Sequence, residues 1–267
     1  MSTKKTSGGF PLTVSALAIV ICLIIGWFIY KTILGASSNF EGGDADKGHP
    51  HNILGTMYKG GFIVPILIGF LLTVITFAIE RFMTIMKANG RGQTDKFVST
   101  IKSLIANHDF DGAIAECDKQ KGSLANVVHE GIEKYRFVQN DAHRDKEAKV
   151  HAIQKALEEA TSLELPMLSK NMVVISTMAS IGTLAGLIGT VVGMIRAFAA
   201  LSAAGAPDTS ALATGISEAL VNTLVGILTS ALAIIFYNYF SNRIDTITYA
   251  MDEAGFSIIQ EFQASGK

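Results

Sequence analysis

An acidic residue lies within an apolar stretch in the last quarter of the sequence. In ISEALVNTLVG, residues 216–226, Glu218 is followed by Asn222 and then by Thr223. An acidic side chain at the middle of a helix in hydrocarbon costs roughly 2.5–3.5 kcal/mol, so it is expected to face a protein interior or a water-filled cavity. Burial also disfavours the charged form of a carboxyl. Glu218 is therefore a candidate for a group that takes up and releases a proton.

The helical period places these polar residues on two faces. At 100° per residue, Glu218, Asn222 and Thr229 share one face, and Thr223 lies about 140° away from Glu218 among small residues. Hydroxyls both donate and accept hydrogen bonds, which suits a chain of waters, although a hydroxyl cannot be the acid that changes charge. The alternative is a structural role, in which Glu218 caps a helix start or pairs with Arg196 or with an interfacial group.

A second polar membrane segment precedes this one. Within residues 172–195, glycine and threonine recur at intervals of four, and Thr190 ends one such row. Rows of small residues let helix backbones approach closely in a membrane. Tight packing alone and a hydrated path beside the helix both remain open from composition. We assign helix packing to Gly182, Gly186, Gly189, Gly193 and Gly226.

The bulk composition narrows the class of protein. The 267 residues are 49% hydrophobic and 17% charged, with a mean hydropathy of +0.38, which is too apolar for an ordinary soluble domain. A net charge of −1 argues against a nucleic-acid binder. The two cysteines and scattered histidines provide no disulfide framework or metal-ligand spacing. With no nucleophile or phosphate-loop motif either, we expect no enzyme, cofactor or metal.

Four apolar runs are long enough to cross a bilayer, whose core takes about 20 helical residues. A cleavable signal peptide is the alternative for the first run, but that run is longer than a usual signal core and the residues around Ala36 form only a weak cleavage site. We therefore favour a retained helix. The runs are residues 12–30, 62–79, 172–195 and 219–236.

The positions of basic residues predict the orientation of these spans. Lys and Arg gather after the second and fourth spans, whereas the loops 36–58 and 197–212 hold few. Because cytoplasmic segments carry the excess of Lys and Arg, residues 81–165 and the C-terminal tail are expected inside and both loops outside. The residues that carry this prediction are Lys4, Lys5, Arg81, Lys87, Arg91, Lys96, Lys170 and Arg243.

The polar middle of the chain has helical periodicity. Its apolar residues recur three and four apart from Phe97 to Ile132, and short polar breaks divide them into a stack of hairpins. The expected fold is an all-α polytopic membrane protein whose long helices extend into a cytoplasmic helical domain. Its expected parts are an extra N-terminal transmembrane helix (1–35), a periplasmic loop (36–58), a transmembrane helix (59–82), a cytoplasmic helical domain (83–165), two pore-side helices (166–240) and a cytoplasmic C-terminal helix (241–267).

Two spaced motifs carry a resemblance to a known family. LAGLIGTVVGMIRAF (184–198) and GISEALVNTLVGILTSALAIIFYNYF (215–240) resemble the last two membrane helices of the MotA/TolQ/ExbB proton-channel family, nearer to its ExbB and TolQ branch. The pattern GLxGTVxGM stands at 186–194, and GIxEALxxTxxGL stands at 215–228 with Ile227 displacing the first leucine of its end. The resemblance extends over residues 57 to 250.

The resemblance implies a homopentamer in the bacterial inner membrane around a pore that holds a dimer of a single-span partner similar to ExbD, TolR or MotB. In this family the partner's membrane aspartate is the chief protonated group. By motif position the family's channel threonines fall on Thr190 and Thr223, and its membrane glutamate falls on Glu218. With Asn222 these residues form the expected proton pathway.

The implied function is that of a proton-channel subunit in an ExbB–ExbD-like motor, which couples proton-motive force to energised transport across the outer membrane with a TonB-like protein as a further partner. The alternatives are a TolQ-like or flagellar or gliding-type stator for envelope integrity or motility, and a non-conducting membrane scaffold. Three departures from the family pattern are the extra first helix and the threonines Thr183 and Thr214 at positions where the family usually has proline.

Overall fold

The computed structural model describes residues 12–45, 48–141, 143–203 and 209–264. Lys4, Lys5 and Asp208 lie outside these ranges. The all-α class is confirmed, since the described residues form helices and turns with an isolated bridge between Phe40 and Pro50 but no strand. Four helices are long and apolar enough to span a membrane, namely α1 (Leu12–Ile29), α3 (Ile63–Asn89), α8 (Met172–Ala203) and α9 (Thr209–Ala264).

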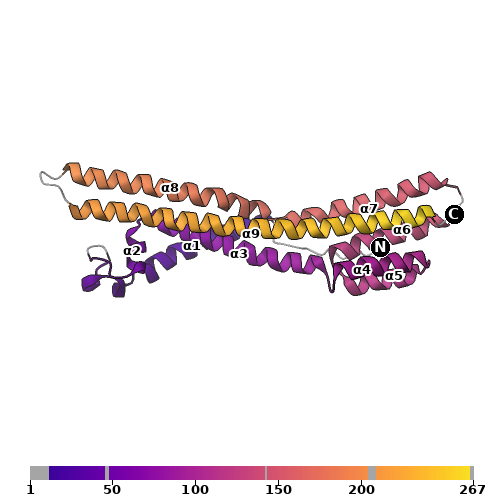
Figure 1. The fold of residues 1–267 in the computed structure, drawn as a ribbon. Helices are drawn as coiled ribbons and strands as arrows, with labels where there is room; N and C mark the ends of the chain where they lie inside the picture. The colour runs from indigo at the N-terminus through magenta and orange to yellow at the C-terminus, as the bar shows by residue number, and fades with distance from the viewer. Residues whose placement is uncertain (1–11, 46–47, 142, 204–208, 265–267) are drawn as a thin grey trace. The chain divides into compact units, whose positions relative to one another are not determined.

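The remaining elements are shorter or more polar (Figure 1). A π-helical turn at Tyr30–Leu34 continues α1, and the loop after it contains two 3₁₀ turns, Ser37–Asn39 and Glu41–Gly43. These are followed by α2 (Ile53–Lys59), and after α3 by α4 (Thr94–Ala106), α5 (Phe110–Gln120), α6 (Gly122–Gln139) and α7 (Lys146–Ser169).

The chain divides into two compact units. Residues 10–79 and 171–238 form what we term the membrane unit, and residues 80–170 and 239–267 belong to the polar unit. The helix α9 contributes residues to both, because it runs unbroken from Thr209 to Ala264.

The polar unit has its own hydrophobic core. Tyr135 of α6 is fully buried, and its ring lies 4.8 Å from the rings of both Phe110 and Phe262. Local sequence defines where these helices begin, since Asp109 and Asp145 accept hydrogen bonds from backbone N–H groups in the first turns of α5 and α7. The apolar residues predicted at intervals of three and four supply the buried side of α4 and α6.

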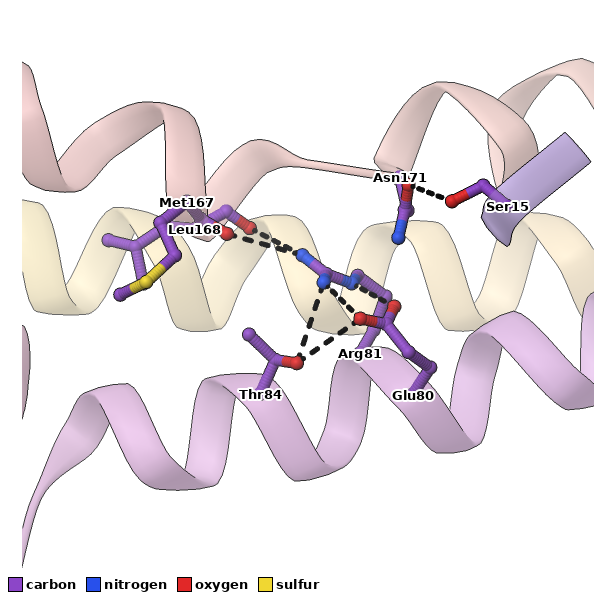
Figure 2. Close-up of polar contacts among 7 residues, drawn as sticks. All are labelled: Ser15, Glu80, Arg81, Thr84, Met167, Leu168 and Asn171. Carbon is purple, nitrogen blue, oxygen red and sulfur yellow. Dashed lines mark hydrogen bonds and ion pairs between the residues drawn. The ribbon is translucent and has the colours of Figure 1, made fainter. Parts of the chain in front are cut away.

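A buried arginine, Arg81, joins two distant segments within the polar unit. Arg81, on α3, has no exposed surface and donates from Nε and Nη2 to the carboxylate of Glu80 at 2.6 and 2.5 Å. Its Nη1 also donates to the backbone carbonyls of Leu168 and Met167 at 3.2 and 3.4 Å (Figure 2). These are among the last carbonyls of α7, which have no partner inside their own helix. Arg81 therefore caps the C-terminus of α7.

The first helix, α1, packs against the other helices of the membrane unit at several points. Gly26 lies so close to α3 that a Cβ atom there would be 2.7 Å from the backbone nitrogen of Gly69. The thiol of Cys22 lies 3.6 Å from the hydroxyl of Thr76. Near its other end, the buried Ser15 donates a 3.0 Å hydrogen bond to Asn171, which precedes α8 (Figure 2). The extra helix is thus held by both small-residue contact and polar contacts.

Candidate functional site

The contact between α8 and α9 forms the frame of the site. A Cβ atom at Gly226 would lie 2.8 Å from the Cα of Gly186, and one at Gly193 would lie 3.0 Å from the backbone nitrogen of Ala219. Backbone atoms cannot yield as a flexible side chain can, so these positions require glycine for the helices to approach this closely. Figure 1 shows the two helices side by side through the membrane unit.

The structure places each glycine assigned to helix packing at this contact. Gly182 faces Ser230 and Gly226, and Gly189 faces the side chain of Asn222, whose Cγ would lie 2.6 Å from an added Cβ. Because Gly189 leaves room for it, the Asn222 amide fits between the two backbones. The rows of small residues on α8 therefore accommodate polar side chains of α9 as well as its glycines.

The two threonines predicted for the proton pathway lie together. The Thr223 hydroxyl donates to the Thr190 hydroxyl at 3.4 Å, and Thr190 donates to the backbone carbonyl of Leu187 at 2.7 Å. Both side chains are half-buried. The result is a short, directional series of hydroxyls between α9 and α8. The first of its hydrogen bonds is long, so it is weak in this arrangement.

Glu218 lies in the same helix contact and is paired with a cation. The residue is 9% exposed, and its Oε1 accepts a 2.8 Å hydrogen bond from Nη1 of Arg196 on α8. The Arg196 side chain is half exposed, and its guanidinium lies over the ring of Phe62, 5.5 Å from the centroid. The pairing is one of the structural roles that the sequence left open. It does not exclude proton exchange, because the exposed partner can separate from the buried one.

Asn222 is bound to a different element. Its Nδ2 donates a 3.0 Å hydrogen bond to the backbone carbonyl of Gly60, in the turn that precedes α3, and the residue is 1% exposed. Its Oδ1 is buried and accepts no hydrogen bond within the described part of the chain. A buried acceptor of this kind normally has a partner such as an ordered water.

The predicted residues thus form two groups. Glu218 and Asn222 are buried on the side of α9 that meets residues 60–62, and Thr190 with Thr223 forms the other group on the side predicted from the helical period. Among the described residues, no hydrogen bond links the two groups directly. The threonine Thr183, noted only as a departure from proline, donates to Ser230 at 2.7 Å and so adds a further polar tie between α8 and α9.

Sequence reasoning missed the turn formed by Gly60 and Gly61. Gly61 has a φ of +80°, and an added Cβ would overlap the carboxylate of Glu218. The only local signal is the glycine doublet itself, which marks a turn but does not name its neighbours. For metal binding, no group of three or more His, Cys, Asp or Glu side chains comes together in the residues that the structure describes.

The polar groups between the membrane helices define the class of protein. It is a multi-pass helical membrane protein with a buried ionisable residue and two linked hydroxyls at the contact of two glycine-rich spans. Such intramembrane groups serve ion or proton movement more readily than covalent chemistry. The sequence profile of the MotA/TolQ/ExbB proton channel family matches residues 119–253, just over half of the chain. The chain belongs to this family, in its ExbB and TolQ branch.

The individual relatives carry names from both parts of that branch. An ExbB-like biopolymer transport protein of Synechocystis is 38% identical over 32% of this chain and 41% of its own length. The Tol-Pal system protein TolQ of Haemophilus influenzae is 29% identical over 81% of this chain and 96% of its own length. The biopolymer transport protein ExbB of Pseudomonas putida is 29% identical over 49% of this chain and 39% of its own length. The chain thus spans about two-fifths of both ExbB relatives.

Proposed function

We propose that the protein is the proton-conducting subunit of a membrane motor that converts proton-motive force into mechanical work on the cell envelope. The observation that carries the proposal is Glu218, an ionisable residue that is 9% exposed inside a helix contact of the membrane unit. Its cation partner, Arg196, is half exposed and can separate from it. When the pair opens, a carboxylate in low-dielectric surroundings favours uptake of a proton.

The threonine pair supports a path rather than an isolated acid. Thr223 donates to Thr190, and each hydroxyl retains acceptor capacity for water. Because Thr190 and Thr223 are only half-buried, water or a polar group of a partner can reach them. The buried Oδ1 of Asn222 offers a further acceptor beside Glu218.

The proposed assembly is a homopentamer around a dimer of a single-span partner similar to ExbD or TolR. Two features support it. The apolar residues Leu187, Val191 and Leu224 on α8 and α9 are each more than half exposed within the single chain, so they require lipid or other helices against them. The threonine pair opens beside this surface, so a partner helix that carries an acidic group would meet it there.

The proposed process is energised transport across the outer membrane of the TonB-dependent type, which follows from the resemblance to ExbB; the names of the ExbB relatives say biopolymer transport. A Tol-type role in envelope integrity is the second candidate, favoured by one observation: the TolQ relative aligns over 96% of its length, whereas the two ExbB relatives align over 41% and 39%. We place the protein in the bacterial inner membrane, with the polar unit on the cytoplasmic side, because the basic residues follow the apolar parts of α3 and α9.

The test is reconstitution of the full chain with the ExbD- or TolR-like protein encoded nearest to it, in liposomes that contain a pH-sensitive dye. We expect proton flux from the wild-type complex and its loss in Glu218→Gln, with the mass of the intact complex unchanged. Glu253→Gln is the matched control, because this exposed residue of α9 lies in the polar unit. Full flux from the Glu218 variant would refute the proposed function.

A further inference from the structure

The turn at Gly60 and Gly61 contacts both polar residues of the buried face of α9. Gly60 accepts the hydrogen bond from Asn222, and Gly61 lies against Glu218. An added Cβ at Gly61 would overlap the Glu218 carboxylate and lie 3.4 Å from Nη1 of Arg196. The turn therefore leaves the space in which the Arg196–Glu218 pair forms.

This turn is held in place by the first helix. The hydroxyl of Tyr30 donates a 2.9 Å hydrogen bond to the backbone carbonyl of Tyr58, two residues before Gly60. The two tyrosine rings are stacked with their centroids 4.6 Å apart, and Tyr30 is 7% exposed. Tyr30 also belongs to a buried cluster that includes Val221 of α9, which adjoins Asn222. Tyr30 thus contacts the end of α2, which leads into the turn, and Gly60 of the turn lies against Val221, where an added Cβ would be 2.9 Å from Cγ1.

A second set of contacts fixes α2, which leads into the turn. Asn39 is 5% exposed and donates from Nδ2 to the backbone carbonyls of Ile33 and Leu34, in the π-helical turn that continues α1. Asn52 donates to Oδ1 of Asn39 at 2.9 Å and caps α2 by accepting from the backbone nitrogen of Gly55. The position of α2 is therefore set by the chain that follows α1, independently of the tyrosine stack.

We propose that Tyr30, Tyr58 and the turn at Gly60 and Gly61 are positioning residues that hold Glu218 against Arg196. The inference rests on the proposed function, because it assigns these residues to the geometry of the proton-path carboxyl. It gives the extra N-terminal helix a specific task. The helix fixes, through the tyrosine stack, the turn that sets the distance between the buried carboxylate and its cation.

The test compares two alanine substitutions that impose the same backbone cost. Gly61→Ala and Gly42→Ala both place a side chain at positive φ, +80° and +73°, but a Cβ at Gly42 meets no atom within 4 Å. The readout is labelling of Glu218 by dicyclohexylcarbodiimide, which adds to protonated carboxyls, in the full chain in lipid nanodiscs. Peptide mass mapping identifies the labelled residue, and Glu218→Gln gives the background.

We expect Gly61→Ala to label Glu218 about fivefold faster than wild type, the factor for losing roughly 1 kcal/mol of ion-pair stabilisation. Gly42→Ala is expected to label at the wild-type rate. If Gly61→Ala does not assemble, Tyr30→Phe, which removes one hydroxyl, is expected to raise labelling in the same direction. Wild-type rates in both Gly61→Ala and Tyr30→Phe would overturn the inference. Proton flux that survives Glu218→Gln would refute the proposed function instead. The labelling comparison would still test whether Gly61 and Tyr30 position Glu218 against Arg196.

Discussion

Removal of Arg81 is predicted to be among the most costly single changes to the polar unit. The guanidinium is fully buried and serves four acceptors at once: the Glu80 carboxylate, the Thr84 hydroxyl and the carbonyls of Met167 and Leu168. Arg81→Met keeps the length and apolar stem of the side chain but leaves a buried carboxylate without its cation. Breaking a buried pair in this way costs about 3–5 kcal/mol of unfolding free energy.

The double variant Glu80→Leu/Arg81→Met separates the contribution of the ion pair from that of the hydrogen bonds that cap α7. It removes both charges, so the remaining loss is chiefly the two carbonyls of α7, about 1–3 kcal/mol. We therefore expect the double variant to be more stable than Arg81→Met alone, with a coupling energy of about 2 kcal/mol or more. The measurement is reversible unfolding in mixed micelles of a mild detergent and dodecyl sulfate, followed by circular dichroism.

A surface pair in the same unit serves as the control. Lys119 and Glu116 are 2.9 Å apart, but their side chains are 74% and 32% exposed. Lys119→Met is expected to change the unfolding free energy by less than about 1 kcal/mol. If Arg81→Met were no more destabilising than this control, the contacts of Arg81 would not stabilise the unit. If the double variant lost as much stability as Arg81→Met and Glu80→Leu together, the two charges would not be coupled as described.

Three further predictions concern packing, thiol chemistry and the hydroxyl pair. Gly226→Ala is expected to destabilise the membrane unit by about 1–3 kcal/mol, because the added Cβ meets backbone atoms of α8, whereas Gly255→Ala, whose Cβ would make ordinary 3.5 Å contacts, is expected to be neutral or slightly stabilising in the same unfolding assay. Burial, with Asp118 and Glu116 nearby, raises the pKa of the Cys117 thiol from its usual 9.0 to about 12. The folded chain therefore holds this proton more tightly than the unfolded one, so Cys117 should resist maleimide at neutral pH, and its contribution to stability should be lost as pH rises from about 9 to about 12, in contrast to Cys117→Ser. Thr223→Val is expected to reduce proton flux in the reconstituted complex while assembly is retained, and Thr248→Val, a hydroxyl that donates only to its own helix at Ile244, should leave flux at the wild-type level.

Much of the fold could be predicted because it depends on local properties of the chain. Hydropathy and length identify the membrane helices α1, α3, α8 and α9, since each needs only an uninterrupted apolar run. The same reasoning could not fix where α9 ends, because past Arg243 its apolar residues are spaced as in an amphipathic helix, no proline follows the span, and a single glycine, Gly255, interrupts neither the pattern nor the helix. The structure shows it continuing to Ala264.

In the candidate site too, the local features could be predicted from the sequence and the long-range contacts could not. The period of 3.6 residues placed Glu218 and Asn222 on one face, and the structure buries both. Their partners could not be predicted in the same way. Gly60 and Gly61 are more than 150 residues distant in sequence and belong to no motif that would point to α9. Arg196 was visible as a basic residue at a helix end, but sequence alone leaves open whether such a residue turns to the membrane surface or to a buried acid.

The two partners of the Arg196–Glu218 pair are buried to different extents, which bears on the proposed role of the carboxyl. Burial of both partners of an ion pair costs desolvation, which their attraction repays only when additional hydrogen bonds satisfy both groups. Here the arginine side chain is 50% exposed and that of the glutamate is 11% exposed. The arginine already lies over the ring of Phe62 and can turn to solvent when the pair opens, whereas the carboxylate stays between α8 and the turn at Gly61. A carboxylate left there must be neutralised from elsewhere, and a proton is the smallest species that can reach it. The geometry therefore favours exchange of Arg196 for a proton at Glu218 over a permanently closed pair.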